Sequence, residues 1–115
     1  MKVRGLDHLV LTVRDIEKTL SFYKSVLGME PVRFGEVRVA LKFGKQKINL
    51  HQAGKEIEPT SGKPTPGSAD LFFLTSMKPK DAMDHVVKEG VEIIEGPVKR
   101  TGANGSIISF YFRAR

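Results

Sequence analysis

Two residues at matched positions of an internal repeat are the strongest candidates for chemistry in this sequence. His8 and Asp70 lie 62 residues apart, and each precedes an apolar run, at 9–11 and 71–73 respectively. His51 follows a further apolar segment. Imidazole nitrogens and carboxylate oxygens held on rigid strands are ligands that divalent ions bind. We therefore predict a metal centre with His8, His51 and Asp70 as ligands, which would polarise a substrate oxygen.

The same side chains could instead have purely structural roles. A histidine in a strand is often a satisfied core residue, and Asp70 could simply accept hydrogen bonds from nearby backbone amides. Asn49 shares its strand face with His51, because side chains repeat every two residues, and it is a candidate for binding substrate. Arg100 is a second such candidate, since its charge could grip a carboxylate or phosphate, although a surface loop is the alternative. Phe72 is a third, as an aromatic residue that either lines the cleft or fills the core.

The first half of the chain predicts a strand, a helix and three further strands. β-branched and apolar residues dominate 6–13, which is typical of a strand. Asp15 then offers an N-cap, apolar residues follow at helical spacing, and Gly28 provides a C-cap. Short strands are expected over 29–34, 37–43 and 47–52.

The second half repeats this plan in a shorter form. Gly28 and Gly90 lie 62 residues apart, the same offset as between His8 and Asp70, and a constant offset indicates an internal duplication. A helix is expected to begin near Pro79 and to end at Gly90. The expected strands are 69–75, 91–94 and 107–112, with a loop rich in glycine and basic residues before the last. We expect module one at about 1–53, a linker at about 54–67 and module two at about 68–115.

Length, composition and charge narrow the class of protein. With 115 residues, 40% apolar residues and no cysteine, the chain is expected to form one domain without disulfides. The formal net charge is +6, but the basic residues are scattered and no nucleic-acid-binding motif accompanies them. No signal peptide precedes the first strand. No apolar stretch comes near the length that a membrane span needs, about 20 residues. We expect a cytoplasmic protein that binds neither membranes nor specific nucleic acids.

Several segments resemble a known superfamily. The run 6–13, followed by the helix that ends Phe22-Tyr23-Lys24-Ser25-Val26-Leu27-Gly28-Met29, looks like the opening of the vicinal oxygen chelate superfamily. That superfamily includes glyoxalase I, fosfomycin- and bleomycin-resistance proteins and extradiol dioxygenases. The segments 47–52, 66–70 and 95–103 are similar to its glyoxalase-domain-containing subgroup. The resemblance runs to about residue 113.

The resemblance also implies a set of metal ligands, which the family carries on the first and fourth strands of each module. By position, the first ligand falls on His8, the second on Asn49 or His51, and the third on Asp70. The family's fourth ligand, a glutamate on the last strand, has no counterpart, because Phe112 is followed only by Arg113-Ala114-Arg115. This departure argues against activity, and it leaves a sheet edge free to pair with a partner.

Together these observations predict an α+β fold of two βαβββ-type modules, the second short by a strand, that form a curled mixed sheet with helices outside. The resemblance implies a glyoxalase-like, metal-dependent enzyme of lyase, isomerase or dioxygenase type, with Zn, Ni, Mn or Fe as its cofactor. Its substrate would be a small oxygenated or anionic molecule, and a homodimer is expected. The alternatives are a non-catalytic small-molecule-binding or drug-resistance protein and an inactive paralogue that dimerises.

Overall fold

The computed structural model describes residues 1–35, 37–58 and 60–114, which form six strands and two helices. Contacts between residues divide the chain into two units, Met1–Leu71 and Phe72–Arg115. Neither helix of the described residues is both long and apolar enough to cross a membrane. Each unit combines one helix with antiparallel strand pairs, and the predicted α+β class is confirmed.

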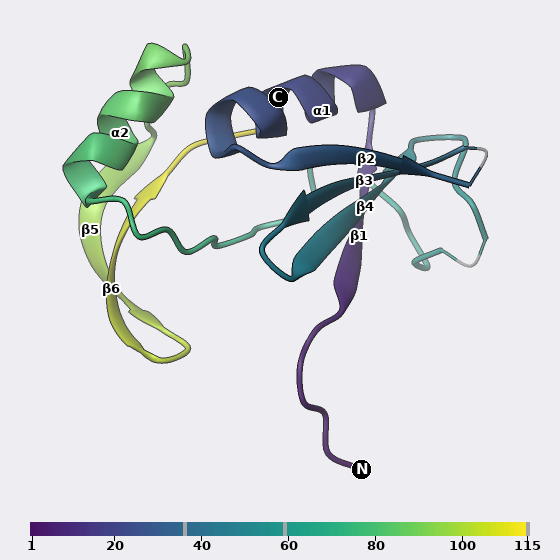
Figure 1. Cartoon of the computed structure of the whole chain (residues 1–115), viewed down its shortest axis with the longest axis horizontal. Coiled ribbons are helices and arrows are strands. Elements are labelled where there is room, and N and C mark those ends of the chain that lie inside the picture. Colours follow the sequence, from purple (N-terminus) through teal and green to yellow (C-terminus); the bar gives the residue numbers. More distant parts are fainter. Residues whose placement is uncertain (36, 59, 115) are drawn as a thin grey trace. The chain divides into compact units, whose positions relative to one another are not determined.

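The first unit is built on a four-stranded mixed sheet (Figure 1). Its strands are β1 (His8–Val13), β2 (Glu30–Phe34), β3 (Arg38–Phe43) and β4 (Gln46–Gln52). They lie in the order β1-β4-β3-β2, with β1 parallel to β4 and the other two pairs antiparallel. All four predicted strands of the first half therefore form, within one or two residues of the expected ends at most positions.

One helix, α1 (Ile16–Leu27), covers one face of this sheet (Figure 1). Gly28 ends the helix in the left-handed conformation at φ +66, and its N–H donates to the carbonyl of Lys24. The helix and the sheet bury an apolar layer between them, in which Leu41 of β3 and Ile48 of β4 are completely inaccessible. This layer fixes which sheet face is left open, because side chains alternate between the two faces of a strand.

The start of α1 offers a first test of the local structure. Asp15 is the N-cap, and its Oδ1 accepts a hydrogen bond of 3.0 Å from the backbone N–H of Lys18. Asp15→Ala removes that acceptor and a negative charge beside the helix N-terminus, so we expect the free energy of unfolding to fall by about 1 kcal/mol. Urea denaturation followed by circular dichroism measures this change. Asp15→Ser keeps an oxygen acceptor and should lose much less; an equal loss in both variants would contradict the capping role.

The second unit contains one helix and one hairpin. The helix α2 (Pro79–Lys88) begins with proline in its first turn, where a missing N–H costs no helical hydrogen bond. Its inward face buries Ala82 and Val86, whereas Val87 is exposed. The strands β5 (Glu95–Gly102) and β6 (Gly105–Tyr111) pair antiparallel, and α2 contacts β6.

The expected strand over 69–75 is wrong, because these residues form neither helix nor strand. In the first unit the corresponding strand, β1, pairs only with β4. No strand equivalent to β4 follows β6 among the described residues, so the segment has no ladder to join. An extended segment becomes a strand only when a neighbour satisfies its backbone groups. Phe72 and Leu74 are accordingly exposed to 58% and 82%.

The assignment of the residues after α2 is also corrected. Residues 91–94 are not a strand, since the N–H of Val91 donates to the carbonyl of Val86 and completes the end of the helix. Val91 is buried through that contact. The segment predicted as a loop is instead β5, which pairs with β6. Its glycine and basic residues are not typical of a strand. Only the two residues between Gly102 and Gly105 make the turn.

Candidate functional site

The candidate residues of the first unit lie on the sheet face that points away from α1. Ile48 and Leu50 of β4 are buried in the apolar layer, so Lys47, Asn49 and His51, which alternate with them, point the other way. The parallel pairing of β1 with β4 sets the neighbours of these residues. The pairs are His8 with Lys47, Val10 with Asn49, and Thr12 with His51.

His8 is held by the residue before it. Its Nδ1 lies 2.8 Å from Oδ2 of Asp7, and the His8 side chain is 39% exposed. The hydrogen bond and the charge of His8 lower the pKa of Asp7 below its usual value, so Asp7 is a carboxylate at neutral pH. A carboxylate can only accept, and Nδ1 must therefore carry the proton. This leaves the lone pair of Nε2 available to a metal ion or to a proton.

His51 lies on the same face but far along the ladder. It is four pairs beyond His8, which corresponds to about 13 Å at about 3.3 Å per residue. Protein ligands lie about 2 Å from a divalent ion such as zinc. This spacing does not bring His8 and His51 to a common ion.

Asn49 is nearer to His8 and carries an unusual feature. It lies two residues beyond Lys47 on the same face, beside Ala40 of β3. Its Oδ1 is buried and has no hydrogen-bond partner within the described part of the chain. A buried oxygen without a donor costs free energy, which a bound ligand or ion would recover.

The predicted ligands do not form a preassembled metal centre in the structure. Asp70 is exposed and lies in the unpaired segment beside the boundary between the two units. Across residues 1–35, 37–58 and 60–114, no group of three or more histidine, aspartate or glutamate side chains is arranged to hold an ion.

The second unit brings together the two other predicted substrate-binding residues. The ring of Phe72 meets the edge of Tyr111, with centroids 5.5 Å apart, and the guanidinium of Arg100 lies 5.8 Å from the same Tyr111 centroid. Arg100 is also paired with Glu95 at 3.0 Å. Tyr111 therefore links Phe72 and Arg100 into one partly exposed aromatic and cationic surface.

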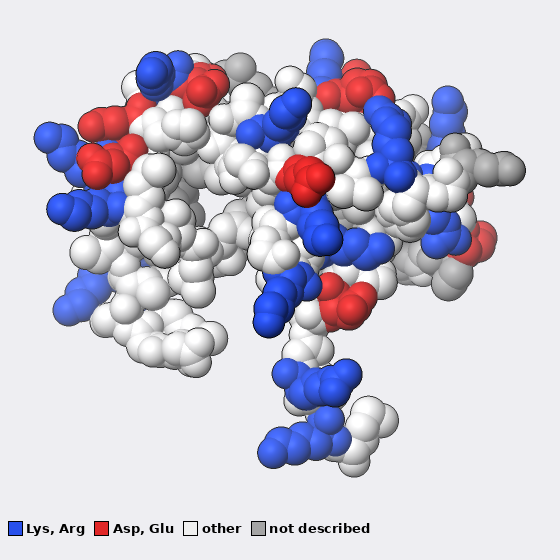
Figure 2. Space-filling view, viewed as in Figure 1, with Lys and Arg blue, Asp and Glu red and all other residues white. Residues whose placement is uncertain are grey.

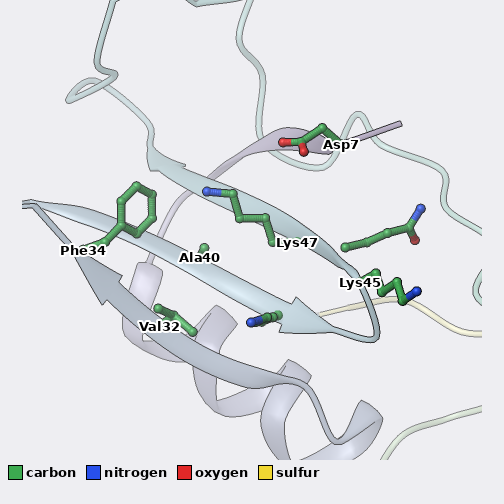
Figure 3. A pocket seen from close by; sticks show the side chains of 8 residues that line it. Asp7, Val32, Phe34, Ala40, Lys45 and Lys47 are labelled. Atoms are coloured by element: carbon green, nitrogen blue, oxygen red, sulfur yellow. The ribbon is translucent and has the colours of Figure 1, made fainter. Parts of the chain in front are cut away.

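A hollow on the open face is lined by residues that the sequence analysis does not single out. We call it the lysine hollow, a cavity of about 360 Å³ lined by Lys42, Lys45, Lys47, Phe34, Val32 and Ala40, with Asp7 at its rim (Figure 3). The signal was present in Lys42-Phe43-Gly44-Lys45-Gln46-Lys47, where a glycine turn folds basic residues back beside one another. From the sequence alone, these lysines are interpreted as scattered surface charge.

Comparison with known proteins identifies the superfamily to which the chain belongs. Residues 5–113 match the Glyoxalase/Bleomycin resistance protein/Dioxygenase superfamily, and the chain is a member of it. The predicted resemblance is confirmed.

Three similar proteins have names that do not state a specific reaction. Virulence protein STM3117 of Salmonella typhimurium is 53% identical over 113 residues, which cover 98% of this chain and 78% of that protein. Glyoxalase domain-containing protein RDO1 of Mycosarcoma maydis is 54% identical, with 98% and 64% covered. An integron cassette protein from the mobile metagenome of V. cholerae superposes with a TM-score of 0.97 at 60% identity, covering 99% of this chain and 89% of that chain.

A more distant structure shares the fold alone. The fosfomycin resistance protein FosX of Listeria monocytogenes gives a TM-score of 0.65 at 20% identity, covering 98% of this chain and 85% of that chain. A variant of FosX has been solved in complex with Mn(II) and 1S,2S-dihydroxypropylphosphonic acid.

Proposed function

We propose that the protein is a glyoxalase-like, metal-dependent enzyme that binds a small oxygenated or anionic substrate on the open face of the β1–β4 sheet. The observation that supports this is the Asp7–His8 pair, in which a carboxylate bonds Nδ1 of an imidazole and does not engage Nε2. Carboxylate–imidazole pairs of this kind are typical of metal ligands and of general bases. The reaction would be of lyase, isomerase or dioxygenase type.

The donors on this face fit a divalent ion chemically. Nε2 of His8 and the partnerless Oδ1 of Asn49 are nitrogen and oxygen donors that suit Zn, Ni, Mn or Fe. His8 would hold the ion with Asp70 and with Asn49, which lies nearer to His8 than His51 does. Such an ion would supply Lewis acidity at a substrate oxygen. That FosX has been solved with Mn(II) supports this choice of cofactor.

The chain's own residues would prepare the substrate. Asp7 holds the Nδ1 proton of His8 and so keeps the ring in one tautomer and one orientation. Lys47, whose backbone pairs with His8 across the β1–β4 ladder, adds a positive charge to the same sheet face, which favours an anionic substrate. His8 can then accept a proton at Nε2 or donate that lone pair, without first having to reorient.

Substitution of His8 tests the proposal directly. We expect protein purified and reconstituted with Mn, Ni, Zn or Fe to hold about one ion per chain, and His8→Gln to weaken the affinity at least about 100-fold. Asp7→Asn, which removes only the orienting carboxylate, should weaken it by about 10-fold to 100-fold. Elemental analysis after equilibrium dialysis measures both effects. His85→Gln on α2 is the matched control and should bind as the parent does. A protein that takes up none of the four metals would overturn the proposal.

A second candidate is non-catalytic binding, as in a drug-resistance protein of the same fold. It is favoured by the absence of three converging metal ligands within the described residues and by the exposed Phe72–Tyr111 surface. Ligand-induced thermal shifts that are unchanged by chelators would support binding without metal.

The proposal also includes an oligomeric state and a cellular location. Among the described residues β1 pairs only with β4, so its other edge is free to pair with a strand of a second copy. We therefore propose a cytoplasmic homodimer, either as the active form of the enzyme or as an inactive paralogue that acts by dimerising. Light scattering coupled to gel filtration measures the mass, and a monomer at micromolar concentration would contradict the dimer.

A further inference from the structure

The lysine hollow narrows the class of substrate, and the inference from it rests on the proposed function. Its volume of about 360 Å³ lies within the range of small-molecule sites, roughly 300 to 1,000 Å³. The floor is apolar, since Ala40 and Val32 lie opposite each other in the β2–β3 pairing and Ala40 is only 1% exposed. A single-ring or double-ring compound therefore matches the space better than an extended polymer.

One wall of the lysine hollow is an aromatic face with a cation already placed on it. Nζ of Lys47 lies 4.4 Å from the centroid of the Phe34 ring, and Figure 3 shows the Lys47 side chain extending past Ala40 towards that ring. Ala40 permits this reach because a larger side chain there would occupy the path. Attraction between an ammonium and a ring face holds Lys47 in one orientation. The charge is thus positioned before any ligand arrives, which lowers the entropic cost of binding.

The charge of the lysine hollow selects for anions. Lys42, Lys45 and Lys47 supply three ammonium groups against the single carboxylate of Asp7, which is already bonded to His8. Lys42 and Lys47 are direct cross-strand partners, so both side chains start from neighbouring positions on the face that lines the hollow. Figure 2 shows basic side chains gathered over the β3–β4 hairpin. A bound anion would offset this excess of positive charge.

We infer that the substrate of this site is a planar aromatic carboxylate. Its carboxylate would lie between the ammonium groups of Lys47 and Lys42, and its ring would pack on Phe34 and on the floor formed by Val32 and Ala40. The aromatic part distinguishes this ligand from inorganic phosphate or a short aliphatic acid, which would use the lysines but leave Val32 and the Phe34 ring in contact with water.

Binding of three probes by isothermal titration calorimetry tests this inference. The probes are 2-naphthoate, the neutral isostere 2-naphthamide and inorganic phosphate. We expect 2-naphthoate to bind at least about tenfold more tightly than either of the others, since each lacks one of the two recognition elements. Lys47→Met should weaken 2-naphthoate by about tenfold or more, and Phe34→Leu by about fivefold. Lys18→Met, on α1 across the sheet, is the control and should leave the affinity unchanged.

The possible outcomes separate this inference from the proposed function. Equal binding of 2-naphthoate and 2-naphthamide, or an unchanged affinity in Lys47→Met, would overturn the role of the lysines. Equal binding of 2-naphthoate and phosphate, or an unchanged affinity in Phe34→Leu, would overturn the aromatic class. Circular dichroism of each variant verifies that it is folded. If 2-naphthoate binds as expected while the protein takes up no metal, the proposed metal-dependent reaction fails and the ligand class stands.

Discussion

Gly96→Ala should lower the free energy of unfolding of the second unit by about 4 kcal/mol or more, or prevent the β5–β6 hairpin from forming. A Cβ at this position would lie 2.6 Å from Cβ of Phe110, 2.7 Å from its Cα and 2.8 Å from the carbonyl oxygen of Ser109. Two of these atoms belong to the backbone of β6, so no side-chain rotation relieves the overlap. The backbone at Gly96 also has φ +117, where any side chain is strained.

Gly105→Ala separates the two causes. Gly105 lies in the same hairpin at φ +122, but a Cβ there meets no atom within 4 Å. Its substitution should cost only the conformational strain, about 1–2 kcal/mol. Urea denaturation, together with amide hydrogen exchange in β5 and β6, measures the difference. Equal losses for the two variants would show that β6 does not approach Gly96 this closely, and the Arg100–Tyr111 surface built on this hairpin would then need another geometry.

Leu41→Ala should destabilise the first unit by about 3 kcal/mol. Leu41 is completely inaccessible, in the middle of β3, where it pairs with Pro31 of β2 and Ile48 of β4. Replacing a fully buried leucine by alanine removes apolar contacts and leaves a cavity, because the surrounding strands relax only in part. The loss also affects function, since the same sheet positions His8, Asn49 and Lys47 on its other face.

Leu6→Ala makes the same chemical change at an exposed site and serves as the matched control. Leu6 is 62% exposed, before the start of β1, and we expect its substitution to change the stability by less than about 0.5 kcal/mol. Chemical denaturation of both variants at equal protein concentration compares them. A loss in Leu41→Ala no larger than in Leu6→Ala would be incompatible with the apolar layer between α1 and the sheet.

The first unit was predictable because its signals are local. Asp15 and Gly28 mark the ends of α1 through hydrogen bonds to residues within five positions, which the sequence contains in full. The strands of 29–52 follow one another through short turns, so each finds its partner next along the chain. The opening part of the superfamily resemblance, 6–13 and the helix that ends at Gly28-Met29, lies in this unit as well.

The second unit was predicted less well because its strands depend on partners. The apolar run 69–75 has the composition of a strand, but no neighbour pairs with it. The glycine-rich stretch that looks like a loop becomes β5 because β6 supplies its hydrogen bonds, with Gly96 allowing the closest approach. Strand composition is a weak guide wherever pairing decides the outcome.

The candidate site also has features that the sequence predicts and features that only the structure shows. His8 stands out in the sequence by its place in the repeat, and the structure adds the bond to Asp7 that orients it. The lysine hollow has a weaker signal, basic residues on both sides of a glycine turn, because Lys42 and Lys47 become neighbours only across the β3–β4 ladder. The Phe34 ring that contacts Lys47 comes from a third strand, β2. The separation of His8 from His51 likewise depends on the register of β1 against β4.

The sequence by itself determined the family, the α+β class, the two helices and the positions of the candidate side chains along the chain. These properties follow from short-range patterns: capping residues, hydrophobic periodicity and motif spacing. Strand register, by contrast, depends on contacts between residues far apart in the chain, and a shift of one residue turns every side chain to the opposite face of the sheet. Only the tertiary structure therefore decided that lysines, an aromatic ring and an oriented histidine share one open face.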